Sequence, residues 1–205
     1  QSLLRAESLP PQDMWFAGER VVYYYGGHLL AASLATLTDT AGRYAYNLAL
    51  AGAYAAAVTA VYDLAGTMAH ARGWSRRRAG GLGAFAFGLA SNLYVPAGLV
   101  ATYLVPKWVG PLATATGNAP SAVRVTTETF SYWWASRVIP GAITEFPFFA
   151  YLNGDLHGHM TVTAFSLLAV AVCYAYYRTP AAEIRRRRLL ALGALPIVVG
   201  VVTLV

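Results

Sequence analysis

Long apolar blocks separated by short arginine runs are the feature that most limits the folds open to this chain. The blocks cover residues 44–69, 82–106, 160–177 and 189–205. A helix needs about 20 mostly apolar residues to cross the roughly 30 Å hydrocarbon core of a bilayer. Only 12% of the residues are charged, whereas a soluble domain carries about 25%. The pattern therefore predicts an all-α, polytopic bundle of transmembrane helices in the lipid bilayer.

The arginines predict how these spans are oriented. Two loops, residues 70–81 and 178–188, hold nine of the fifteen basic residues. Because arginine and lysine are enriched in cytoplasmic loops, we expect both loops on the cytoplasmic side of a plasma membrane. The spans then alternate in direction, and the loop of residues 107–159 lies outside. The net charge of +6 comes from these runs, so the sequence does not indicate nucleic-acid binding.

Residues 1–43 are expected to form a segment on the outer face. Their apolar block, residues 21–38, is short for a span and contains Gly26, Gly27 and His28, which are costly in mid-membrane. If the block crossed fully, Asp13 would lie on the cytoplasmic side. We favour a surface-lying or re-entrant helix, which keeps Asp13 on the side of the outer loop.

The two ends of the chain suggest that it is incomplete. It starts at Gln1 without a methionine, and it stops inside an apolar block at Val205. We therefore expect one transmembrane domain, residues 1–205, that is a fragment of a longer protein.

Two clusters of polar residues are candidates for chemistry. The first has Asp13, followed by the tyrosine run Tyr23, Tyr24, Tyr25 and then His28. A carboxylate near a low-dielectric surface can act as a general base. The alternative is a solvated loop acid beside an ordinary aromatic belt.

The second cluster has Glu145, Asp155, His157 and His159 within fifteen residues. In an extended segment, residues two apart point to the same side, so the last three could form a metal site or a clamp on a phosphate or sugar. The alternative is a polar loop end that caps the next helix. Before this cluster, Arg137 follows several aromatic residues and could bind a phosphate or stack on a sugar, or could belong to an interfacial belt.

Four strings resemble a known family of membrane proteins. They are PPQDMWFAG at 10–18, YYYGGH at 23–28, YNLAL at 46–50 and SRVIPGAITEFPFFAYLNGDLHGHM at 136–160. In order and spacing they resemble the "YYY" membrane protein family of archaea and Chloroflexus-type bacteria, a domain of unknown function. That family in turn resembles the GT-C class of membrane glycosyltransferases, in which an outer-loop acid precedes a glycine, a tyrosine and a surface-lying helix.

The resemblance to the GT-C class implies specific roles. Asp13 would be the catalytic base, with Glu145 or Asp155 as the alternative bases. Asp155, His157 and His159 would bind a lipid phosphate, directly or through a divalent metal ion, and Arg137 would help to stabilise its charge. The donor would be a polyprenyl-phosphate sugar. The rival hypothesis is a non-catalytic module for lipid binding, assembly or transport, with other membrane subunits as candidate partners. Whether Asp13 and the histidines face one cavity distinguishes the two hypotheses.

Overall fold

The computed structural model of the protein describes residues 2–21, 23–90, 92, 132–137, 139 and 141–204. Two compact units are present: Gln1–Ala84 with Asn153–Val205, and Phe85–Leu152. The regular structure in the described residues is helical, apart from one β-bridge between Gln12 and Arg20. This confirms the all-α class, while the single transmembrane domain stays a prediction.

Two long helices form the centre of the first unit. Helix α3 spans Gly42–His70 and α8 spans Gly158–Arg178, and both are long and apolar enough to cross a membrane. Only 6% and 11% of their most apolar windows are buried within the protein. An apolar helix surface that the protein leaves uncovered needs a lipid environment. The predicted spans 44–69 and 160–177 are therefore confirmed as candidate membrane helices.

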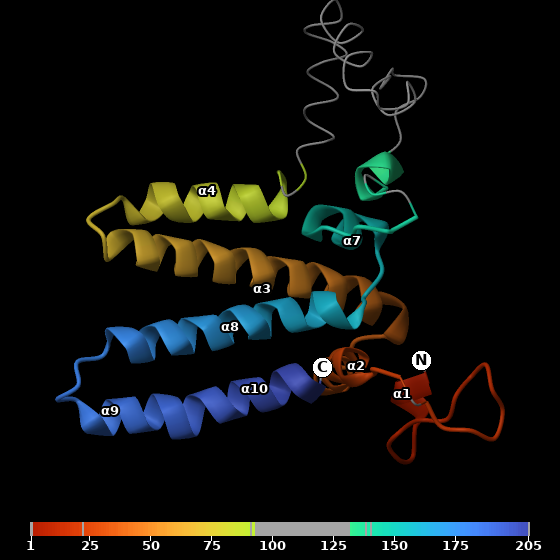
Figure 1. Ribbon diagram of the computed structural model, residues 1–205. Coiled ribbons are helices and arrows are strands. Elements are labelled where there is room, and N and C mark those ends of the chain that lie inside the picture. Colours follow the sequence, from red (N-terminus) through yellow and green to blue (C-terminus); the bar gives the residue numbers. More distant parts are fainter. Residues whose placement is uncertain are drawn as a thin grey trace, which may run out of the picture. The chain divides into compact units, whose positions relative to one another are not determined.

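Helix α8 packs between α3 on one side and the C-terminal helical run on the other (Figure 1). This run consists of α9 (Ile184–Arg188), the π-helical turn η3 (Leu189–Ala194) and α10 (Leu195–Leu204). Pro196 has no N–H to bond the carbonyl one turn before it, which is a common reason for a helix to widen locally. The predicted block 189–205 is thus helical, with a π turn that the sequence pattern did not predict.

Both arginine runs lie partly on helices, so the loops are shorter than predicted. Helix α4 spans Arg76–Gly88 and therefore begins inside the predicted loop 70–81. Ser75 explains this start, because its Oγ accepts a hydrogen bond at 3.4 Å from the N–H of Arg78, as an N-cap does. Similarly, α9 begins inside the predicted loop 178–188. The remainder of the predicted span 82–106 lies largely outside the described residues.

Small residues allow α4 to approach α3 closely. A Cβ atom on Gly80 would lie 2.7 Å from the carbonyl oxygen of Tyr62 and 3.0 Å from its ring, and one on Gly83 would lie 2.9 Å from Cβ of Ala65. Close contact of small residues is a usual way for membrane helices to pack, since lipid supplies no hydrophobic force between them.

We expect Gly80→Val to lower the melting temperature in detergent by roughly 3–10 °C, because the added side chain has to push α4 away from α3. Gly81→Val is the matched control, since a Cβ atom at Gly81 meets nothing within 4 Å. Equal melting temperatures for the two variants would contradict the close packing. Thermal unfolding followed by circular dichroism measures the difference.

The two arginine-bearing turns lie at the same end of the first unit. One joins α3 to α4 and the other joins α8 to α9 (Figure 1). The C-terminal halves of α3 and α8 line a common pocket. This arrangement is the one that the predicted orientation requires, because both turns can then meet the same membrane surface. The cytoplasmic side itself stays a prediction.

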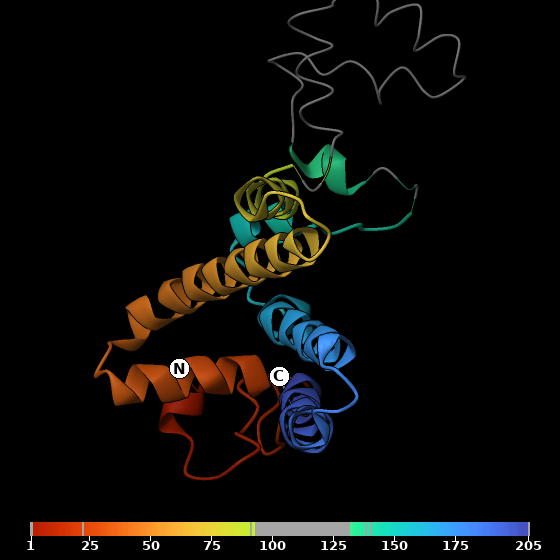
Figure 2. The same ribbon diagram turned by 90° about the vertical axis from the view of Figure 1, so that its left-hand side faces the viewer.

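A short helix lies across the opposite end. Helix α1 spans Ser2–Arg5, and α2 spans Gly26–Leu37. Twelve residues reach about 18 Å, well short of a bilayer core. Figures 1 and 2 together show that α2 runs across α3 and α8 rather than alongside them. Its length and direction agree with the expected surface-lying helix rather than with a full span.

In its described residues, the second unit includes the short helix η2 (Tyr132–Ser136) and nearly all of α7 (Pro147–Asn153). Asn92 donates a hydrogen bond of 2.8 Å to the carbonyl of Ala135, and the rings of Trp133 and Phe149 meet edge to face at 5.3 Å. The predicted outer loop 107–159 contains Trp133, Ala135 and Phe149, whereas Asn92 lies in the predicted span 82–106. The loop is therefore partly helical, and its residues 107–131 lie outside the described residues.

Candidate functional site

The segment before α8 forms the first part of the candidate site. Gly154 has φ +76°, a backbone conformation open to glycine, and it turns the chain toward Asp155. The Nε2 atom of His157 lies 2.8 Å from Oδ2 of Asp155. His157 is the N-cap of α8 and is extended, whereas His159 is already in the first helical turn. The extended backbone predicted for this segment therefore does not reach His159, although the His159 ring still lies beside the His157 ring, with centroids 5.5 Å apart.

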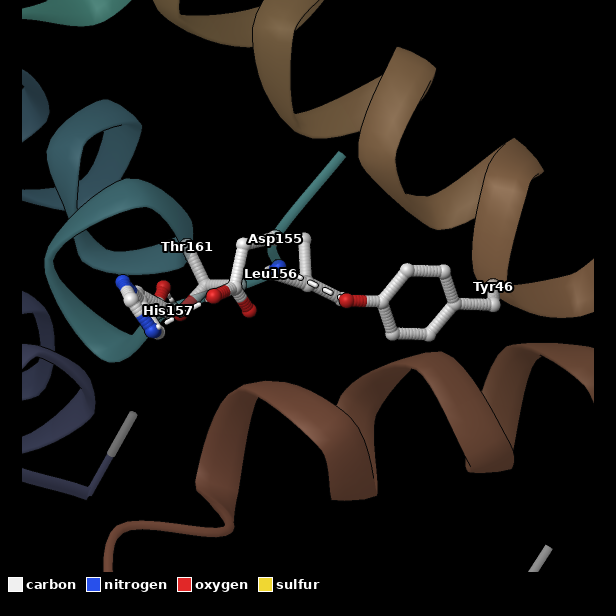
Figure 3. A network of polar contacts seen from close by, with 5 residues as sticks. All are labelled: Tyr46, Asp155, Leu156, His157 and Thr161. Atoms are coloured by element: carbon white, nitrogen blue, oxygen red, sulfur yellow. Dashed lines mark hydrogen bonds and ion pairs between the residues drawn. The ribbon is translucent and has the colours of Figure 1, made fainter. Parts of the chain in front are cut away.

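Tyr46 of α3 fastens this segment in place. Its hydroxyl accepts a hydrogen bond of 2.8 Å from the backbone N–H of Leu156, whose side chain is buried (Figure 3). The Tyr46 ring also stacks beside the His28 ring, with centroids 6.3 Å apart. Tyr46 was not among the predicted site residues, although it begins the string YNLAL that the resemblance included. A tyrosine in an apolar block gave no other signal of this role.

The N-termini of α2 and α8 converge at this point. A Cβ atom on Gly27 would lie 2.8 Å from both Cβ and Cγ2 of Thr161, and one on Gly158 would lie 3.1 Å from the ring of Tyr24. Neither helix has a side-chain cap at its N-terminus. Helix N-termini carry partial positive charge and free N–H groups, so they attract anions. The convergence therefore gathers helix N–H groups near the imidazoles of His28 and His157, beside Asp155, and we call this cluster the polar site.

His28 lies half-buried at the start of α2, outside the candidate membrane spans. Burial lowers the pKa of His28 below the ordinary value of 6.5, and the nearby Asp155 carboxylate only partly opposes that effect. The neutral imidazole is therefore favoured in the folded protein. As a neutral ring it can donate one hydrogen bond and accept another.

This pKa predicts a pH dependence of stability. Because the unfolded chain binds the proton more tightly, stability falls as the pH drops below 6.5 toward the lowered pKa. We expect the melting temperature of His28→Gln to fall less over this range than that of the native protein. His70→Gln, at the exposed end of α3, is the control and should keep the native slope. Parallel curves for native protein and His28→Gln would contradict the burial effect.

An apolar groove leads away from these polar residues. It has a volume of about 810 Å³ and lies between α2, α3 and α8. Gly27, Leu156 and Thr161 line it beside the polar residues, and Ala60 and Leu168 line its far part. Along α3 it extends from Ala45 to Ala60, about 22 Å at the helical rise. The first unit therefore places a cluster of polar groups beside an apolar groove, an arrangement that matches an amphiphile.

The other predicted site residues are held in different ways. Asp13 lies in the loop before α2, where its Oδ1 accepts hydrogen bonds from the N–H groups of Trp15 at 2.7 Å and Phe16 at 3.2 Å. The contacts that the structure describes for Asp13 all stay within this loop. The rings of Tyr23 and Tyr24 are 3.8 Å apart, and Tyr25 is the N-cap of α2.

Arg137 and Glu145 belong to the second unit. The guanidinium of Arg137 lies over the ring of Trp133, 5.7 Å from its centroid, and donates to Oγ of Ser136. The structure thus shows Arg137 in contact with residues of its own chain. The proposed roles of Arg137 and Glu145 at a substrate stay predictions.

A divalent metal ion at Asp155, His157 and His159 also stays a prediction. One ring nitrogen of His157 lies within 4.8 Å of one of His159. Imidazole and carboxylate are suitable ligands for several divalent ions. However, Nε2 of His157 already contacts Asp155, so this contact would have to be exchanged for the metal.

Comparison with known proteins assigns the chain to a family. A family model described as "Uncharacterized membrane protein (DUF2298)" matches residues 1–205. The chain belongs to this family. No curated protein and no solved structure matches the chain.

Membership of the uncharacterised membrane protein family confirms that the chain is a membrane protein, in contact with lipid. It agrees with the two apolar helices α3 and α8. The family description assigns no activity to the polar site.

Proposed function

We propose that the protein binds a polyprenyl-phosphate sugar at the non-cytoplasmic face of the membrane and transfers the sugar to an acceptor. The observation that carries this proposal is the apolar groove between α2, α3 and α8, whose wall includes Gly27, Leu156 and Thr161 beside the polar site. A lipid tail in the groove would bring its phosphate to the two helix N-termini. Burial of the apolar tail contributes about 0.8 kcal/mol per CH₂ group.

The chemistry of the polar site suits a phosphate. The N-termini of α2 and α8 favour an anion there, and His28, His157 and His159 supply imidazole donors. During sugar transfer, negative charge grows on the departing phosphate, so donors held in place stabilise the transition state. The contact with Asp155 orients the ring of His157.

The polar site lies at the end of the first unit opposite the arginine-bearing turns. If those turns are cytoplasmic, as arginine enrichment predicts, the polar site lies on the non-cytoplasmic side of the membrane. An extracytoplasmic site requires a donor that is already across the membrane, and a lipid-linked sugar meets this condition.

The proposed reaction is a displacement at the anomeric carbon. An acceptor hydroxyl oxygen forms the new bond to that carbon, and the bond from the carbon to the phosphate oxygen breaks. The phosphate leaves with the electron pair, and a carboxylate takes the proton of the hydroxyl group. By resemblance to the GT-C class this base is Asp13. Asp155, which contacts His157 in the polar site, is the alternative base.

A second candidate function is a non-catalytic module that binds a lipid phosphate for assembly or transport. The observation that favours it is the position of Asp13, whose Oδ1 serves as a turn acceptor within its own loop. To act as the base at the polar site, Asp13 would have to exchange these hydrogen bonds for contact with the acceptor.

The two functions differ in what Asp13→Asn should do. For the enzyme, transfer from radiolabelled polyprenyl-phosphate sugars in membranes should fall by about 100-fold or more, since general bases contribute about 10²–10⁴. Glu19→Gln, in the same loop, should leave transfer unchanged. Transfer that survives Asp13→Asn keeps the enzyme and moves the base to Asp155 or Glu145. Absence of transfer together with tight binding of polyprenyl phosphate supports the non-catalytic module.

A further inference from the structure

A second pocket lies at the arginine-rich end of the first unit, where it adjoins the far part of the apolar groove through the shared lining residues Ala60 and Leu168. It has a volume of about 550 Å³ and lies between the C-terminal halves of α3 and α8. The two ends of α8 are separated by about 30 Å at the helical rise, so a headgroup bound in this pocket cannot reach the polar site. We propose that this pocket binds an anionic phospholipid, with an acyl chain between the helices and the phosphate on Arg178 and Arg186.

The walls of the pocket divide into apolar and cationic parts. The inner wall is formed by small and aliphatic side chains, among them Ala60, Leu64, Leu168 and Ala171. Arg178 and Arg186 lie at the rim, where α8 ends and α9 begins. An apolar slot with cations at its mouth matches a phospholipid, whose tails are apolar and whose phosphate is charged.

The charges at this end leave a positive excess. Asp63 lines the pocket, but its Oδ1 is paired at 3.2 Å with a guanidinium nitrogen of Arg76. Arg186 has an exposed partner, Glu183, at 3.5 Å, and such exposed pairs are weak. The contacts described for this part of the chain give Arg178 no acidic partner. Arg178 is thus free to meet a phosphate.

The surrounding residues add to this potential. Residues 60–81 and 174–188 contain nine arginines and two acids. Clusters of basic residues at the end of membrane helices attract anionic headgroups, and basic pockets between such helices bind them specifically. A soluble phosphate would use the arginines but leave the apolar wall uncovered, so the pocket favours the lipid.

The test uses the full chain in neutral detergent, with native mass spectrometry to measure bound lipid. Phosphatidylglycerol is titrated against phosphatidylcholine. We expect the protein to retain phosphatidylglycerol, and Arg178→Gln with Arg186→Gln to weaken this retention about thirtyfold, taking about a fivefold contribution per arginine at an anionic surface. The matched control is Arg72→Gln with Arg77→Gln, which removes the same charge from exposed positions that do not line the pocket.

Filling the apolar wall gives an independent reading. Ala171→Phe keeps every charge but occupies the slot, so it should also weaken retention of phosphatidylglycerol. Ala169→Phe, on the same helix but not lining the pocket, should not. Circular dichroism and size-exclusion chromatography identify any variant that fails to fold, and the other pair of variants then decides.

Three results would overturn the proposal. Equal losses in the two arginine pairs would mean that net charge alone attracts the lipid. Unchanged retention in Ala171→Phe would mean that no acyl chain enters the slot. If inorganic phosphate alone bound with the same dependence on Arg178 and Arg186, and displaced phosphatidylglycerol, the ligand would be a soluble anion rather than a lipid.

Discussion

Asp155→Asn should lower sugar transfer, and retention of polyprenyl phosphate, about 10- to 100-fold. Its carboxylate lies 2.8 Å from Nε2 of His157 and holds that ring at the N-terminus of α8. Loss of a carboxylate that orients and polarises a functional histidine typically has an effect of this size. His157→Ala should cost about 100- to 1000-fold in transfer, because it removes a donor to the growing phosphate charge.

The control for this prediction is Asp39→Asn. Asp39 is exposed and has φ +51°, a left-handed conformation that asparagine tolerates as well as aspartate does. The same chemical change there should leave transfer and lipid retention at native levels. Native transfer rates in Asp155→Asn would contradict the role of this carboxylate in orienting His157. Steady-state transfer rates, with retention measured separately, distinguish lost binding from lost chemistry.

Gly27→Leu should disrupt the site as a whole. A Cβ atom at this position would lie 2.8 Å from Cβ and Cγ2 of Thr161, a buried residue whose hydroxyl donates to the carbonyl of Gly158 at 2.9 Å. The added side chain has to separate α2 from α8, and overpacking of this kind costs about 1–3 kcal/mol, or more when backbone must move. We expect a melting temperature lower by about 5–10 °C and loss of lipid binding, since the groove shares this wall.

A double substitution tests the cause. Gly27→Ala combined with Thr161→Gly makes room for the new methyl group, so the pair should be less destabilised than the sum of the two single changes. Gly200→Ala is the control, because a Cβ atom there meets nothing within 4 Å and alanine favours a helix. Additive losses in the double variant would show that the contact of Gly27 with Thr161 does not limit the approach of the helices.

Much of the helical framework follows from local patterns. The apolar blocks 44–69 and 160–177 became α3 and α8, because a run of apolar residues of this length satisfies its backbone polar groups within a helix. The arginines predicted that the two basic turns share an end, and they do. The helix starts were missed where a local cap decided them, as at Ser75, and the π turn was missed before Pro196.

The candidate site was only partly predictable. Asp155 and His157 stood out because ionisable residues crowded at a membrane boundary are seldom there by chance. The role of Tyr46 did not, since its partner Leu156 is 110 positions away in the chain. Asp13 stood out in sequence, yet its described hydrogen bonds remain within its own loop.

The sequence by itself determined the helices that need a membrane, their shared basic end and the residue types available for phosphate chemistry. These properties depend on composition over one or a few helical turns. The tertiary structure alone decided that Gly27 and Gly158 let α2 and α8 meet, that Tyr46 holds the intervening segment, and that a groove opens below them. Such contacts join residues more than a hundred positions apart, and their geometry depends on which side chains are small enough for two helices to approach.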